Sequence, residues 1–193
     1  MNYKTLFSRS MLLLSSPAKA WREIIQDGVG ESGESVGTSY VYPMITLCGL
    51  CMFIGVLFGN GVDDFNLQVV LTKCCGVFVS LFGGYFLSTY LIDIFGRRFL
   101  NGMEEDQALV AALVGYSMVV IFVLDIFTYL FPSFFIFKWI LQFYLVYIVW
   151  EGVKVLMRIP ENKMLVYTIV SSMIILLSPF LIEWVFGKLS SMN

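Results

Sequence analysis

The chain has 193 residues, of which 59% are hydrophobic and only 13% carry a charged side chain. This composition exceeds what a water-soluble core needs and predicts an integral membrane protein. The formal net charge of −2 and the scattered Lys and Arg residues argue against nucleic acid as a partner, because binding phosphates requires concentrated positive charge. The sequence has no histidine, so the commonest neutral metal ligand and the usual general base near pH 7 are both missing.

The N-terminal residues 2–26 are predicted to form two short amphipathic helices. The apolar run before Ala18-Lys19-Ala20 is shorter than the roughly 7 to 15 residues of a signal peptide, so we expect no cleavage there. Ser16 is a candidate N-cap, and Pro17 suits the first position of the second helix. We expect both helices to lie on the membrane surface, with packing on the protein as the alternative. Their apolar faces would hold Tyr3, Leu6, Phe7, Met11 and Leu14 in the first helix, and Trp21, Ile24 and Ile25 in the second.

The stretch GVGESGESVGTS, residues 28–39, contains the spacing of a dinucleotide-binding loop. Such a loop follows a strand and holds a phosphate at a helix N-terminus, whereas here an amphipathic helix precedes it and Glu31 and Glu34 would repel phosphate. We therefore interpret it as a flexible linker. The chain then divides into a cytoplasmic N-terminal segment, residues 1–39, and a transmembrane domain, residues 40–193.

The transmembrane domain is predicted to contain five helices, because a helix needs ~20 apolar residues to cross a bilayer. A single helix in place of the third and fourth spans would run ~75 Å, which favours a turn at Phe131–Ser133. The predicted fold class is therefore an all-α integral membrane protein with amphipathic helices at its N-terminus. The five spans are Val41–Gly59, Leu71–Phe95, Ala108–Leu130, Phe134–Met157 and Leu165–Phe186.

The positions of Lys and Arg predict the orientation, because positively charged loops stay in the cytoplasm. Nine basic residues fall on one side of the predicted spans and three on the other, which predicts a cytoplasmic N-terminus and an external C-terminus. The nine are Lys4, Arg9, Lys19, Arg22, Arg97, Arg98, Lys154, Arg158 and Lys163; the three are Lys73, Lys138 and Lys188.

Four motifs in chain order resemble the Yip1 domain family, particularly its bacterial branch. They are SPAKAWREI, YVYPM with Tyr42 and Pro43, GYSM with Gly115 and Tyr116, and YIVWEGVKVLMRIPENKMLVY. Many members have a proline after the third motif, where this chain has Val119-Val120, so a functional kink there is not expected to carry over. The resemblance implies five spans and, for eukaryotic members, membrane factors of vesicle traffic that bind prenylated small GTPases and one another. Bacterial members are generally of unknown function, and the start of this chain looks bacterial, which implies the inner membrane.

Small residues recur where helices are expected to approach closely. Gly76, Ser80, Gly84 and Ser88 follow one another every four residues in the second span, and Gly55 and Gly59 do so in the first. Ala108, Ala111, Ala112 and Gly115 offer a partner surface on the third span. Packing within one bundle is favoured over a homodimer interface.

The four cysteines fall on the first two predicted spans. Cys48, Cys51, Cys74 and Cys75 could supply four thiolates to Zn²⁺. However, zinc ligands of this spacing usually sit on turns rather than in membrane helices, so buried apolar thiols are the favoured interpretation. We predict no metal and no cofactor.

Charged residues in predicted spans are candidates for function, because burying a charge in lipid is costly. Asp125 lies ~9 Å inside the outer end of the third span, either hydrogen-bonded toward the bundle or as a proton or cation site. Asp93 with Arg97, and Glu151 with Lys154, have the spacing of helical ion pairs at the cytoplasmic ends. With Arg98, Arg158 and Lys163 they could form a surface for an anionic lipid or a protein partner. Trp139 and Trp184 fall near span ends, where indole rings prefer the headgroup region.

The residues favour a non-enzymatic membrane scaffold or adaptor, with no catalytic residues. Its expected partners are the lipid bilayer and a membrane or cytoplasmic protein, with a second copy of the chain as a further candidate. The alternative is a small transporter or channel that uses Asp125 and the Glu151/Lys154 pair; the lack of an apparent inverted repeat weakens it. An intramembrane enzyme would need a clustered nucleophile and base or metal ligands, which the sequence does not offer.

Overall fold

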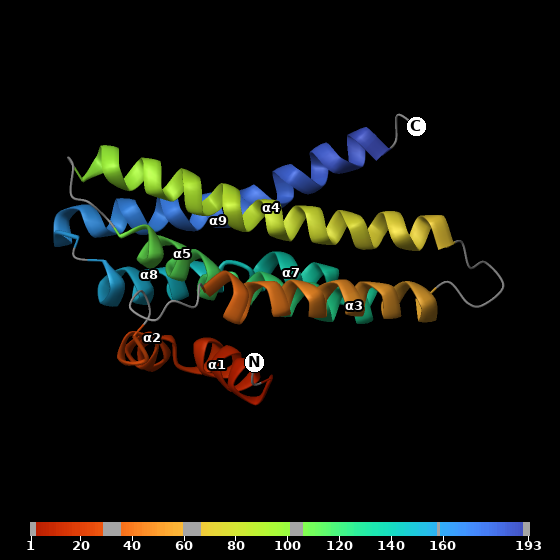
Figure 1. Cartoon of the computed structure of the whole chain (residues 1–193), viewed down its shortest axis with the longest axis horizontal. Helices are drawn as coiled ribbons and strands as arrows, with labels where there is room; N and C mark the ends of the chain where they lie inside the picture. The colour runs from red at the N-terminus through yellow and green to blue at the C-terminus, as the bar shows by residue number, and fades with distance from the viewer. Residues whose placement is uncertain (1–2, 29–35, 60–66, 101–105, 158, 191–193) are drawn as a thin grey trace.

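The computed structural model describes residues 3–28, 36–59, 67–100, 106–157 and 159–190. Every regular element in these ranges is a helix, as predicted (Figure 1). Two short helices come first and the long helices of a bundle follow. They are α1 (Tyr3–Ser15), α2 (Pro17–Gln26), the π-helix η1 (Gly37–Val41), α3 (Tyr42–Gly59), α4 (Leu67–Phe99), α5 (Gln107–Ser117), α6 (Val119–Leu130), the 3₁₀-helix η2 (Pro132–Phe134), α7 (Phe135–Leu141), α8 (Tyr144–Leu156) and α9 (Glu161–Ser190).

Four helical stretches of the described chain are long and apolar enough to cross a membrane, which confirms an all-α integral membrane protein. They are Gly37–Leu57, Leu67–Phe99, Gln107–Leu130 and Glu161–Ser190, and the bent pair η2–α7 with α8 makes a fifth if it counts as one span. The second and last helices are longer than predicted by about a turn at each end. Within the third span the helix is irregular only at Met118, so an interruption occurs at the last residue of GYSM even without a proline after it.

The fourth span, predicted as one helix from Phe134 to Met157, is broken. Pro132–Leu141 and Tyr144–Leu156 meet at an angle of 43°, around Gln142 and Phe143. Neither residue is a proline or glycine, so no helix breaker in the sequence marks the bend. Packing explains it, because α7 lies against α6 whereas α8 lies against α5, α2 and α9.

The stripe of small residues on α4 faces α9, and these two helices lie together along most of their length (Figure 1). A Cβ atom added at Gly84 would lie 2.5 Å from Cγ of Pro179, and one at Gly83 would lie 2.7 Å from Ile182. The seam is thus intramolecular, as predicted. Its partner is the last helix rather than the alanine-rich face of the third span. Gly55 of α3 instead packs on the backbone carbonyl of Tyr129 in α6.

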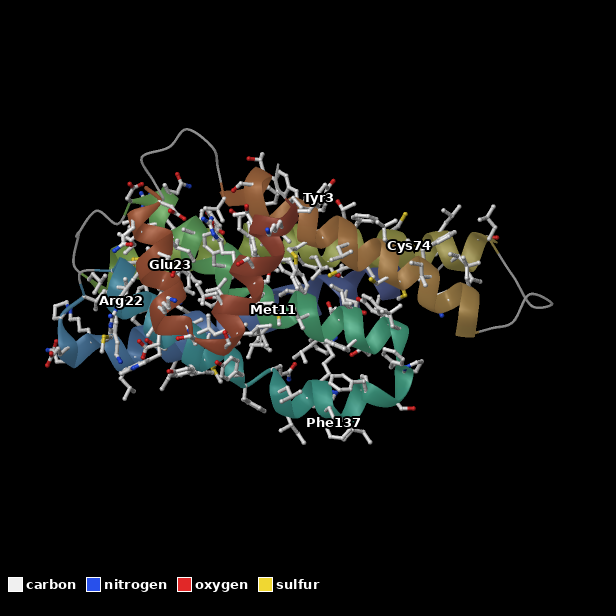
Figure 2. All side chains as sticks on the ribbon, turned by 90° about the horizontal axis from the view of Figure 1, so that it is seen from below. Tyr3, Met11, Arg22, Glu23, Cys74 and Phe137 are labelled. Atoms are coloured by element: carbon white, nitrogen blue, oxygen red, sulfur yellow. The ribbon has the colours of Figure 1, made fainter. Side chains whose placement is uncertain are left out.

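The N-terminal helices α1 and α2 cross the long axis of the bundle and pack on its side (Figure 2). The expectation that both apolar faces rest on the membrane is wrong for α2. Its Trp21 and Ile24 are 0% and 1% exposed, because α2 packs against α8 of the bundle. Ser16 precedes this helix but its hydroxyl makes no capping hydrogen bond. The stripe expected on α1 is exposed at Tyr3, Phe7 and Met11.

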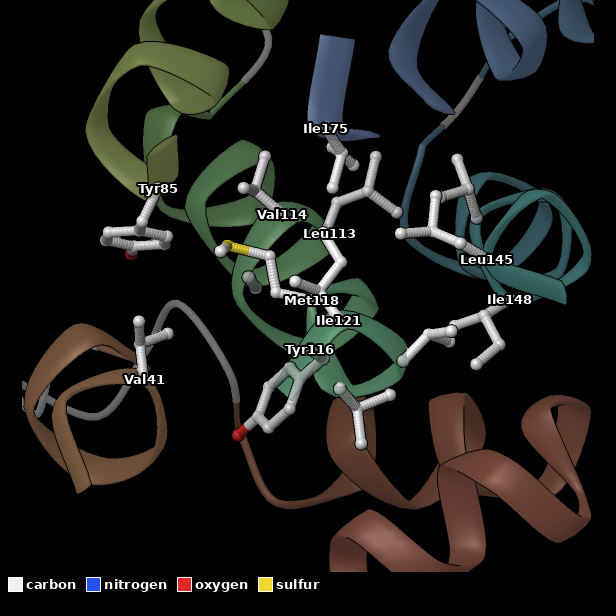
Figure 3. Packing of buried hydrophobic residues seen from close by; sticks show 14 of the residues in the cluster. Val41, Tyr85, Leu113, Val114, Tyr116, Met118, Ile121, Leu145, Ile148 and Ile175 are labelled. Carbon is white, nitrogen blue, oxygen red and sulfur yellow. The ribbon is translucent and has the colours of Figure 1, made fainter. Parts of the chain in front are cut away.

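The core surrounds the third span, whose residues are more buried than those of the other spans. Leu113, Val114 and Met118 lie at its centre and contact side chains from α4, α8 and α9 (Figure 3). Because α1 and α2 cover α5 and α8 from the outside, this part of the bundle needs no lipid to bury its apolar side chains.

The two ends of the bundle differ in charge. One end holds the C-terminus of α4 and the start of α9, with Arg97, Arg98 and Lys163, and we call it the basic end. The opposite end holds the C-terminus of α3 and the start of α4 (Figure 1). At 33 residues α4 is about 50 Å long, so it exceeds a hydrocarbon core of about 30 Å and reaches beyond it.

Candidate functional site

The motif residues of the sequence converge where α1 and α2 meet the bundle. Tyr40 of η1 and Tyr116 of α5 pack ring on ring, with centroids 4.8 Å apart. Arg9 of α1 donates a hydrogen bond to the Tyr116 hydroxyl at 2.9 Å and forms an ion pair with Asp27. The Tyr40 hydroxyl lies 2.8 Å from the hydroxyl of Ser10. We call these five residues the junction.

The glycine and tryptophan next to the junction explain why these motifs occur together. A Cβ on Gly115 would lie 2.8 Å from Cγ2 of Val41, so only glycine lets α3 start this close to α5 (Figure 3). Trp21 donates from its indole to the carbonyl of Ile148 at 3.0 Å and rests on Gly152. Packing therefore brings YVYPM together with GYSM. It also brings SPAKAWREI, through Trp21, together with the fourth motif, through Ile148 and Gly152.

Tyr42 and Pro43, also singled out from the sequence, begin α3 beside the junction. The Tyr42 ring packs against Phe82 of α4 with centroids 5.1 Å apart. Pro43 is the second residue of α3 and directly follows the π-helix η1 within the continuous stretch Gly37–Leu57. Its missing amide therefore falls where the helical hydrogen-bond pattern changes. Both residues thus position α3 rather than form a chemical site.

The predicted partner surface consists of two separate ion pairs at the basic end. Asp93 and Arg97 of α4 pair at 2.9 Å, with the carboxylate nearly buried, and Glu151 and Lys154 of α8 pair at 3.1 Å. Within the described residues no ion pair links the two, so they share an end of the bundle but not a site. Arg98 is exposed, whereas Arg158 lies outside the described residues.

A further link at this end was not predicted. Lys163 at the start of α9 donates a hydrogen bond to the carbonyl of Phe99 at 3.0 Å, which caps the last turn of α4. Its ammonium also lies 5.3 Å from the centre of the Phe99 ring. The contact closes the basic end of the α4–α9 seam.

The cysteines lie on α3 and α4 as free thiols. Cys48 is buried and donates to the carbonyl of Phe122, while Cys75 is exposed. Among the described residues, no group of three or more His, Cys, Asp or Glu side chains is placed to hold a metal ion.

Asp125 is 4% exposed on α6 and forms an ion pair with Lys138 of α7 at 2.5 Å. Lys138 is one of the three basic residues predicted to lie on the outer side. In the structure it points back along the hairpin into the bundle. The turn at Pro132 could have revealed the pair, since Asp125 stands seven residues before it and Lys138 six after (132 − 125 = 7; 138 − 132 = 6). In an antiparallel hairpin such positions lie at the same height.

The ion pair lines a cavity of about 330 Å³ between α4, α6, α7 and α9. Glu183 of α9 also lines this cavity. It was not predicted, because nothing in the sequence fixes the position of α9 along α6. Gln142, at the bend of the fourth span, also lines it. Trp139 and Trp184, predicted to mark span ends, stand at its rim and are 53% and 58% exposed.

Together these features define a multi-pass helical membrane protein, with docked N-terminal helices and a charged cavity among its spans. A match to the Yip1 domain covers residues 11–182, from the end of α1 to the last turns of α9. The chain therefore belongs to the Yip1 domain family. No curated protein and no solved structure matches it.

Proposed function

We propose that the chain is a non-enzymatic scaffold or adaptor of a bacterial inner membrane, with the basic end and the N-terminus in the cytoplasm and the C-terminus outside. The observation that carries the proposal is the fixed α1 helix. Four hydrogen bonds tie it to the bundle and to the end of α2: Arg9 with Tyr116 and with Asp27, Ser10 with Tyr40, and the carbonyl of Leu14 with the hydroxyl of Tyr144. Its outer face nevertheless remains apolar and exposed.

That outer face consists of Tyr3, Phe7 and Met11, which are 76%, 66% and 55% exposed and lie on one side of α1. An apolar face that is exposed to water costs free energy unless lipid or a protein covers it. Since α1 is held in one place, whatever covers this face is held against the bundle.

The orientation is supported by the charges. Arg97, Arg98 and Lys154 belong to the basic end, whereas Lys73 lies near the start of α4 at the opposite end. Positively charged segments next to membrane spans stay in the cytoplasm. A C-terminal alkaline phosphatase fusion should be active and a C-terminal fluorescent-protein fusion dark; the reverse pattern would overturn the orientation.

The scaffold function is tested by co-purification from gently solubilised native membranes. Tyr3→Ser/Phe7→Ser/Met11→Ser removes the apolar face without touching the docked side of α1, and Glu151→Gln/Lys154→Gln removes the charges of α8. Lys73→Gln at the opposite end is the matched control. A defined protein held by wild type and the control but lost from either variant supports the proposal, whereas a partner set that no variant changes contradicts it.

A second candidate function, a small transporter or channel, is favoured by the cavity around Asp125. Glu151 and Lys154 pair with each other on α8 and do not line that cavity, so the described residues show no charged path from one to the other. Flux into liposomes that is lost in Asp125→Asn supports transport. Its absence with several small ions leaves the scaffold as the function.

A further inference from the structure

We propose that the cavity between α4, α6, α7 and α9 binds an organic ammonium ion, with the positive head group beside Glu183 and an apolar body toward the lipid. This site does not depend on the scaffold function. The inference rests on charge, aromatic lining and shape, taken in turn.

The charges of the cavity do not cancel. Asp125 and Lys138 neutralise each other at 2.5 Å, and Glu183 acts on this pair only at longer range. In the described part of the chain Glu183 makes no side-chain hydrogen bond and no ion pair of its own. Glu183 is exposed at the mouth of the cavity. One carboxylate beyond the Asp125–Lys138 pair thus stands at the lipid-facing rim of the cavity, where an unbalanced charge is costly. A monovalent cation restores neutrality.

The lining selects an organic cation. Aromatic rings stand around the cavity on three helices, with Tyr129 on α6, Trp139 on α7, and Phe180 and Trp184 on α9. Rings of this type attract ammonium groups through their electron-rich faces, and tryptophan does so most strongly. A divalent metal ion would instead need several oxygen ligands, and no such group occurs among the described residues.

Lys138 does not make the cavity an anion site, because its charge is already used by Asp125. Breaking that pair to bind an anion would leave two carboxylates, Asp125 and Glu183, without a close cation. An anionic ligand is therefore disfavoured relative to a cation of the same size.

The shape fits a small amphipathic molecule. A volume of about 330 Å³ is at the lower end for small-molecule pockets. The rim is apolar and open, since Phe135 and Phe180 are 54% and 53% exposed on the bundle surface that lipid surrounds. The apolar part of a ligand can reach the lipid there while its head stays at Glu183.

The test uses the full chain in a neutral maltoside detergent, with benzyltrimethylammonium as the probe and calorimetry as the measurement. Wild type should bind this cation but neither benzyl alcohol nor phenylacetate, which have similar size and no positive charge. Glu183→Gln should weaken binding about tenfold or more, because it removes the charge and keeps the shape. Trp139→Leu should weaken it about fivefold by removing an aromatic face.

Glu161→Gln is the matched control, because it makes the same chemical change on the exposed first turn of α9. All variants are first compared with wild type by gel filtration and melting temperature, so that a misfolded protein is not counted. Unchanged binding in Glu183→Gln, or tighter binding of phenylacetate than of the cation, overturns the proposal.

An ammonium group can come from a lipid headgroup or from a free amine, and one further arm separates these sources. Phosphatidylethanolamine that displaces the probe, when phosphatidylglycerol does not, identifies a lipid headgroup as the ligand. Displacement by neither lipid identifies a free organic cation. Equal displacement by both would show that lipid chains alone fill the cavity, and it would overturn the charge-based site.

Discussion

The junction and the cavity both bring polar side chains together between helices, but they satisfy them differently. At the junction, Arg9 donates hydrogen bonds to the Tyr116 hydroxyl and the Asp27 carboxylate, and the hydroxyls of Tyr40 and Ser10 share a hydrogen bond. In the cavity, Lys138 pairs with Asp125 and reaches Glu183 only through a longer-range charge interaction. A buried polar network with every partner present holds elements together, whereas a leftover charge beside an open volume is suited to a ligand.

The largest expected effect tests the junction side of this comparison. Trp21→Ala should lower the free energy of unfolding by about 3 to 5 kcal/mol, since it removes a fully buried indole and leaves a space against Gly152. Thermal unfolding in detergent measures it. Arg22→Ala, the exposed neighbour on the same helix, should change the melting temperature little, and an equal loss in both variants would contradict the docking of α2.

The next effect concerns the ion pair of the cavity. Asp125→Ala should cost about 3 kcal/mol, because Lys138, whose side chain is only 28% exposed, would lose its ion-pair partner. The double variant Asp125→Ala/Lys138→Met should recover most of that loss. A double variant no more stable than the single one would show that the pair does not act as a unit.

A smaller effect is expected at Arg9. Arg9→Gln should cost about 1 to 2 kcal/mol, because the ion pair with Asp27 is half exposed and partly screened by water. Hydrogen exchange should become faster at the amides of α1 and α2, while those of the α4–α9 seam stay protected. Faster exchange throughout the bundle would mean that the junction supports the whole fold rather than the docked helices.

The smallest effect is expected at Lys154 on α8, which belongs to the proposed partner surface. Lys154→Gln should change the free energy of unfolding by less than about 0.5 kcal/mol, since its side chain is 40% exposed beside Glu151. The melting temperature measures this. A large loss would identify the pair as a structural support and remove it from the proposed partner surface.

The sequence alone predicted the helical spans well, because apolar length and small-residue spacing are local signals. Gly76, Gly84 and Ser88 do mark a helix seam. The helix that packs against them was not predictable. The alanines of the third span and Pro179 of α9 offer equally small surfaces, and tertiary packing decides which of the two contacts α4.

The cavity could be predicted only in part. Asp125 stands out as a charge in an apolar run, and its partner Lys138 follows from the hairpin turn between them. Glu183 does not, because it lies in a helix whose register depends on contacts far away in sequence. The docking of α2 was also missed, since an apolar face that covers lipid and one that covers protein have the same pattern.

Pro179 lies in the middle of α9, where it lacks the amide that would otherwise close the helical hydrogen bond to residue 175. Its ring fits against Gly84 so closely that even a methyl group there would clash. Pro179 thus divides α9 into two parts that both pack on α4, through Ser88 before it and through Gly83 and Gly76 after it. The second part carries Glu183 and Trp184. Any bending of α9 at Pro179 moves one wall of the cavity. The volume of the cavity therefore depends on the bend angle of this single helix.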